Sequence, residues 1–128
     1  MALITHHRTT EGIHELVFKK ASRASIEELT NLLDKMYQAN TGSSYCLLDL
    51  RPSGMLPIRY LTHQMRRLHT RYPHHQPIHM AIVLNDGLML NMSQVLLRTV
   101  MQRDRAQYFT EMDKAKEWLL LEQKKTLS

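Results

Sequence analysis

The feature that most constrains the fold is the segment from Pro77 to Leu84, which is almost continuously apolar. A strand with one face in water alternates apolar and polar residues, whereas a strand covered on both faces is apolar throughout. The segment therefore predicts a central strand of a parallel sheet. A second apolar segment, 44–50, predicts a similar buried strand. Because parallel neighbours need a crossover connection, usually a helix, the two segments favour an α/β fold.

Helical patterns occur in the intervening segments. Residues 26–39 have the apolar spacing of an amphipathic helix, and Ser25 with Glu28 matches a capping box that would start this helix at Ile26. The other predicted helices begin near three positions: Pro57, Leu88 and Met112. The predicted helix over 88–103 is apolar nearly all round, so we expect it to be buried.

Three shorter strands complete the predicted order. A hairpin is predicted from two strand-like segments, 2–7 and 13–20, with Gly12 in the turn between them. A last strand is predicted over 106–109. The order is ββαβαβαβα, which is an α/β fold with a mixed, mostly parallel sheet of four to five strands and about four helices. We expect one domain over residues 2–121, followed by a polar tail over 122–128.

Bulk composition limits the class of protein. The 128 residues suit one domain, and 43% hydrophobic with 23% charged residues is typical of a globular protein. The single cysteine, Cys46, lies in the second buried strand and is expected in the core. The chain shows no signal peptide and no apolar run of membrane-spanning length, so we expect a cytoplasmic protein.

The order of elements and three segments resemble the STAS family, in particular its SpoIIAA-like members. The segments are the opening of the first helix, a strand ending in an acidic residue, and a short aromatic strand followed by a capped helix: 25–29, 45–50 and 108–119. This resemblance covers about residues 2–121. It implies a non-enzymatic module that binds other proteins and, in some relatives, nucleotides or lipids.

The resemblance also directs attention to one serine. In the anti-sigma antagonists of this family, a phosphorylatable Ser followed by Gly lies where the loop after the third strand meets the second helix. Here the corresponding pair is Ser53-Gly54, a few residues before the predicted helix start at Pro57. Ser53 is therefore a displaced counterpart of that serine.

The chain shows no pattern typical of catalysis or metal binding. Of the eight histidines, His63 and His69 are six residues apart on a predicted helix, and neighbouring histidines on a strand face opposite sides. No HExxH, G-x-S-x-G, P-loop or dinucleotide-binding motif is present. We therefore predict no catalytic residues, no metal site and no cofactor.

The second predicted helix has a basic face. His69 lies largely off its apolar stripe, and Arg71, His74 and His75 continue the face at the helix end. Four further residues off the stripe are the candidates for partner binding: Arg59, His63, Arg66 and Arg67. The face is either simply solvated or a docking surface for an acidic protein, nucleic acid or anionic lipid. Nucleic acid is disfavoured because few aromatic residues lie nearby for base stacking. A homodimer is the other protein partner compatible with the sequence.

A ligand site, if the chain has one, is expected at the carboxyl ends of the central strands. Ligands of open α/β sheets bind at this edge, close to helix N-termini. The two loops predicted to lie there supply five candidate residues: Arg51, Ser53, Gly54, Asn85 and Asp86. The leading hypothesis is thus a regulatory or protein-interaction domain, and the alternative is a small-ligand or lipid carrier that uses this edge.

Overall fold

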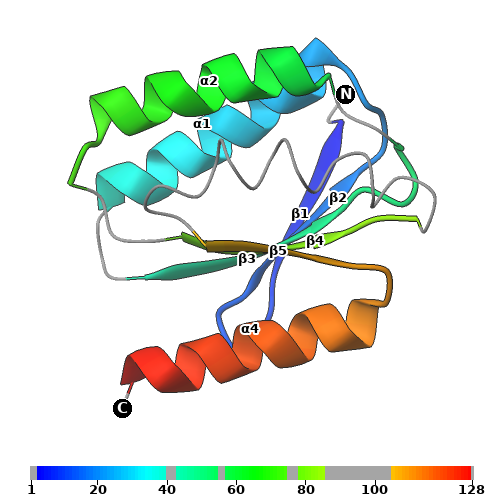
Figure 1. Cartoon of the computed structure of the whole chain (residues 1–128), viewed down its shortest axis with the longest axis vertical. Helices are drawn as coiled ribbons and strands as arrows, with labels where there is room; N and C mark the ends of the chain where they lie inside the picture. Colours follow the sequence, from blue (N-terminus) through cyan, green and yellow to red (C-terminus); the bar gives the residue numbers. More distant parts are fainter. Residues whose placement is uncertain (1–2, 40–42, 55–56, 75–77, 86–104, 128) are drawn as a thin grey trace.

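The computed structural model describes residues 3–39, 43–54, 57–74, 78–85 and 105–127 (Figure 1). Within this part of the chain, five strands and three helices follow one another. Their bounds are β1 Ile4–Arg8, β2 His14–Phe18, α1 Arg23–Ala39, β3 Ser44–Asp49, α2 Ile58–Arg71, β4 Ile78–Val83, β5 Arg105–Phe109 and α4 Met112–Leu127. The helix expected over 88–103 and residue Asp86 lie outside the described residues.

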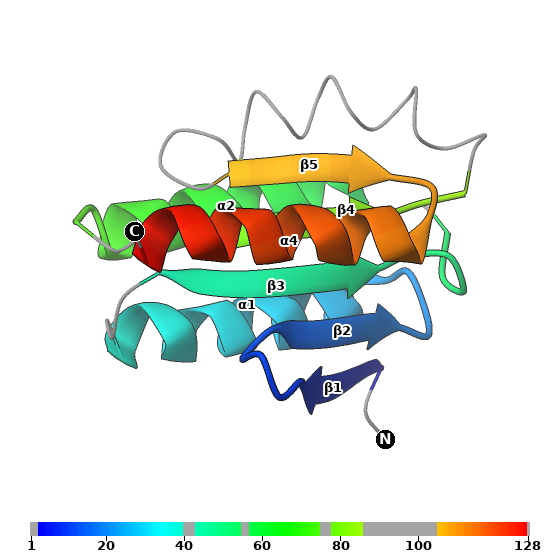
Figure 2. The ribbon, with the colours of Figure 1, turned by 90° about the horizontal axis from the view of Figure 1, so that it is seen from below.

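All five strands form one sheet in the order β1-β2-β3-β4-β5. The pair β1–β2 is antiparallel, and the three other pairs are parallel. Helices α1 and α2 cover one face of this sheet, and α4 lies across the other face (Figures 1 and 2). The predicted α/β class with a mixed, mostly parallel sheet is confirmed.

Alternate residues of the central strands point into two separate cores, as the pleat of a strand requires. Cys46 and Leu48 of β3 face the core beneath α1 and α2, together with Met80 of β4. Leu47 and Ala81 face the smaller core beneath α4. Every residue of β4 is buried, so the prediction of a strand covered on both faces is confirmed. The expected burial of Cys46 is also confirmed.

Helix α1 starts three residues earlier than the sequence predicts. The Ser25 amide donates to the Ser22 hydroxyl (3.2 Å), and the Ser22 amide donates back to the Ser25 hydroxyl (2.9 Å). This reciprocal pair is a capping box with Ser22 at the N-cap. Glu28, expected to complete the box with Ser25, instead accepts a hydrogen bond from the Leu3 amide (2.8 Å).

Helix α4 continues to Leu127 and so includes most of the segment expected to be a polar tail. Glu122 is buried and pairs with Arg105 of β5 (3.2 Å). The Gln123 side chain donates to the Glu11 carbonyl in the β1–β2 turn (2.7 Å). These contacts hold the helix end against the sheet. No helix of the described residues is long and apolar enough to cross a membrane.

Candidate functional site

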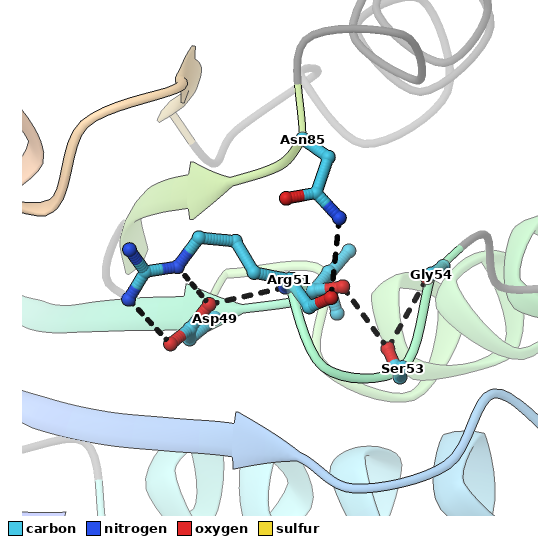
Figure 3. Close-up of polar contacts among 6 residues, drawn as sticks. Asp49, Arg51, Ser53, Gly54 and Asn85 are labelled. Carbon is cyan, nitrogen blue, oxygen red and sulfur yellow. Dashed lines mark hydrogen bonds and ion pairs between the residues drawn. The ribbon is translucent and has the colours of Figure 1, made fainter.

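The loop that leaves β3 and the end of β4 meet at one edge of the sheet (Figure 3). Leu50 extends the strand pairing because its amide donates to the Val83 carbonyl (2.9 Å). Asn85 reaches across from the end of β4, and its side-chain amide donates to the Arg51 carbonyl (3.2 Å). The structure therefore brings together Arg51 and Asn85, as parallel neighbouring strands should.

Arg51 is held by Asp49, the last residue of β3. Its Nε and a terminal nitrogen donate to the two Asp49 oxygens at 2.9 and 3.0 Å, and its amide donates to Oδ1 at 3.1 Å. The Asp49 side chain is 8% exposed and that of Arg51 is 41% exposed. Such a two-pronged, charge-assisted contact is among the strongest polar interactions in proteins.

The contact between Asp49 and Arg51 also shifts the pKa values of both side chains. Burial by itself raises the pKa of Asp49, but the hydrogen bonds and positive charge of Arg51 outweigh it and hold that pKa below its ordinary value. The hydrogen bond to Asp49 raises the pKa of Arg51 in turn. The Asp49 carboxylate is thus ionised and paired with the Arg51 guanidinium. Arg51 would therefore bind an external anion only in competition with Asp49.

Ser53 and Gly54 complete the turn before α2. Gly54 has a φ of +80°, a backbone conformation that residues with a Cβ rarely adopt, and its amide donates to the Leu50 carbonyl (2.9 Å). The Ser53 hydroxyl lies 3.3 Å from the Leu50 carbonyl and 3.2 Å from the Gly54 carbonyl. The hydroxyl that the resemblance singled out therefore has acceptors within its own loop.

The basic face of α2 has a different character. Arg59, His63, Arg66 and Arg67 are all exposed, and within the described part of the chain none of them forms an ion pair. The opposite side of the helix is anchored in the core by three buried residues: Leu61, Met65 and Leu68. The four predicted residues therefore lie on one solvent-facing side of a fixed helix.

Acidic residues of α1 neutralise only the flank of this face. Arg71 pairs with Asp34 (3.3 Å), and the Tyr60 hydroxyl donates to Glu27 (2.8 Å), which raises the pKa of the Tyr60 phenol. Between these two links lies a groove of about 260 Å³, to which Arg67 also contributes. The groove is lined by both signs of charge, whereas the outer face of α2 carries positive charge alone.

Sequence reasoning missed two features. It predicted that Arg51 binds a ligand and did not consider an ion pair with Asp49. An acidic residue two positions before an arginine at a strand end indicates such a pair. It also missed that His6 and His14 lie diagonally across the β1–β2 pair, with Nε2 of His6 and Nδ1 of His14 3.0 Å apart. That contact depends on the hairpin register. Among the described residues, no group of three or more His, Cys, Asp or Glu side chains could hold a metal ion.

Comparison of the chain with protein-family models, with curated proteins and with solved structures found no match.

Proposed function

We propose that this chain is a cytoplasmic, non-enzymatic protein-interaction domain of the STAS type, and that the basic face of α2 docks an acidic surface of a partner protein. The observation that carries the proposal is the set of four exposed basic side chains on α2 that have no acidic partner within the described residues. The order of elements that resembles the STAS family supports the same class of function.

The charge of the face favours association with an acidic partner. Complementary charges raise the rate of encounter and disfavour partners of like charge. Because Leu61, Met65 and Leu68 fix the helix on the sheet, the face is presented on a rigid element. Little ordering of the backbone is then required on binding, which preserves affinity.

The loop around Arg51 supports the carrier alternative less well. Its guanidinium is paired with Asp49, its Ser53 hydroxyl has acceptors within the turn, and Asn85 donates to the Arg51 carbonyl. A ligand at this edge would have to break contacts that the loop already makes, whereas a partner at α2 would not.

The test compares two triple charge reversals. One variant carries Arg59→Glu, Arg66→Glu and Arg67→Glu, and the control carries the same change in net charge at exposed positions outside α2: Lys19→Glu, Lys20→Glu and Lys124→Glu. Each purified protein is used to capture partners from a native lysate, followed by quantitative mass spectrometry. We expect an acidic protein to be captured by the wild type and the control but not by the α2 variant.

Two outcomes would refute the docking face. One is capture of the same proteins by all three forms. The other is equal loss in both variants, because that result reports net charge rather than the α2 surface. Retained sub-micromolar binding of duplex DNA or RNA at physiological salt, with a steep salt dependence, would instead favour a nucleic-acid binder.

A further inference from the structure

A cavity of about 410 Å³ lies between the β1–β2 hairpin and the C-terminal half of α1. It is separate from the α2 face, because residues of α1 that border α2, such as Glu27 and Asp34, lie on the other side of that helix. Its size falls within the range of roughly 300 to 1,000 Å³ that is usual for small-molecule sites.

Part of the lining of this cavity is apolar. Leu16 of β2 forms part of it and is almost completely buried, while Leu32 and Met36 of α1 are partly buried against the main core. Met is well suited to such a position because its flexible thioether adapts to different ligands. A simple inorganic anion would leave this apolar surface uncovered, so the lining favours a ligand with an apolar body.

The rim of the cavity is basic. The cavity is lined by four titratable side chains: His6 and Arg8 from β1, His14 from β2 and Lys35 from α1. Among the described residues, no acidic side chain lines it. The strand register explains the grouping: His6 pairs with Leu16, and Arg8 pairs with His14. These two cross-strand pairs therefore point to the sheet face that α1 covers.

The two histidines of this rim are in direct contact. The His6 and His14 rings are stacked with their centroids 5.2 Å apart, and Nε2 of His6 lies 3.0 Å from Nδ1 of His14. Burial, followed by the positive charges of His6 and Arg8, lowers the pKa of His14. An anion bound at the rim would relieve this mutual repulsion and could accept hydrogen bonds from the same groups.

We infer that this cavity binds a small amphiphilic carboxylate, with the carboxylate at the rim formed by His6, Arg8, His14 and Lys35 and the apolar body against Leu16, Leu32 and Met36. An arginine at the rim suits this ligand because its planar guanidinium can donate two parallel hydrogen bonds to a carboxylate. The body is a medium-length alkyl chain or a single aromatic ring, since the cavity cannot enclose a diacyl lipid.

The experiment uses octanoate as the probe and the whole chain as the receptor. Isothermal titration calorimetry gives the affinity, and backbone amide shifts in NMR spectra locate the ligand. Two matched probes separate the contributions: octylammonium has the same chain with the opposite charge, and acetate has the same charge without the chain. We expect octanoate to bind with a Kd of about 1 mM or tighter, and each matched probe to bind at least about tenfold more weakly.

Two variants change exposed positions, so that both should fold. The first, Arg8→Gln with Lys35→Gln, removes two rim charges and should weaken octanoate binding about tenfold or more. The second, Ala39→Trp, puts a large side chain at the cavity margin and should weaken it to a similar extent. The matched control, Arg66→Gln with Arg67→Gln, removes two charges from α2 and should bind octanoate as the wild type does. Thermal melts establish that each protein is folded.

A second readout is pH. Lowering the pH from 7 to about 5.5 should strengthen octanoate binding, because the lowered pKa of His14 puts its protonation below the ordinary histidine range, and the added positive charge lies beside Arg8 and Lys35 while octanoate stays largely ionised. Equal affinity for octanoate and octylammonium, amide shifts confined to α2, or unaltered binding in both cavity variants would each overturn the inference. So would the absence of octanoate binding to the folded wild-type protein.

Discussion

Arg51 is exposed to solvent, as are three arginines of α2, Arg59, Arg66 and Arg67, yet their surroundings differ. Arg51 follows a buried strand, and Asp49 takes up its guanidinium with two hydrogen bonds. Arg59, Arg66 and Arg67 lie on the outer side of a helix and have no carboxylate partner among the described residues. The difference separates charges that stabilise the fold from charges that remain available to a partner.

The largest effect should come from the inner side of α2 rather than from its charged side. Leu61→Ala removes a buried side chain and leaves a cavity, which should lower the free energy of unfolding by about 2 to 5 kcal/mol. Urea denaturation measures the change. Arg66→Ala on the outer side of the same helix is the control and should change the free energy by about 0.5 kcal/mol or less.

The next effect concerns the carboxylate that holds Arg51. Asp49→Ala removes three hydrogen bonds to a charged group and should lower the free energy of unfolding by about 2 to 3 kcal/mol. Asp34→Ala breaks the exposed pair with Arg71 and should lower it by less than about 1 kcal/mol. Equal losses in chemical denaturation would show that the Asp49–Arg51 pair is no more structural than a surface ion pair.

Acid should weaken the Asp49–Arg51 pair. The folded pKa of Asp49 is lower than the unfolded value of about 4, so the pair stabilises the fold fully above that value. This stabilisation is lost as the pH falls through the lower, folded pKa. The difference in unfolding free energy between wild type and Asp49→Ala should therefore shrink between pH 5 and pH 2. A difference that stays constant over this range would contradict the assignment.

The smallest effect on stability should follow from reversing the α2 charges. Arg59→Glu with Arg66→Glu and Arg67→Glu changes exposed residues only, and each substitution should alter the free energy of unfolding by about 0.5 kcal/mol or less. Differential scanning calorimetry checks this prediction, because a small change in the free energy of unfolding gives a small shift in melting temperature. A large loss of stability in this variant would place these arginines with Arg51 among the structural charges.

The sequence was sufficient to predict the parts of the fold that depend on burial. The apolar segment around Met80 predicted a strand covered on both faces, and the stripe through Leu61 and Met65 predicted the inner side of a helix. Where two local motifs competed, the sequence was insufficient. Both Ser22 and Ser25 are residue types that favour an N-cap. In the structure Ser22 takes this position, and Glu28 accepts a hydrogen bond from the distant Leu3 amide.

The candidate sites were predictable to a smaller extent. The basic side of α2 follows from helical spacing alone, so its exposed residues were found from the sequence. The role of Arg51 depends on a side-chain contact with Asp49, and the cavity at the hairpin depends on the register that places His6 beside Leu16. Registers and side-chain pairings involve residues distant in the chain, and local patterns do not encode them.

The strand order of the sheet also imposes a sequence of events during synthesis. Each strand pairs with the strand that precedes it in the chain, so the sheet can grow one strand at a time as the polypeptide leaves the ribosome. Helix α4 is the last of the described elements to be made, and it alone among them covers Tyr45, Leu47 and Val83. Until α4 emerges, one face of the nascent sheet presents apolar side chains to water. A chain that stops after β5 would therefore expose an apolar surface prone to aggregation.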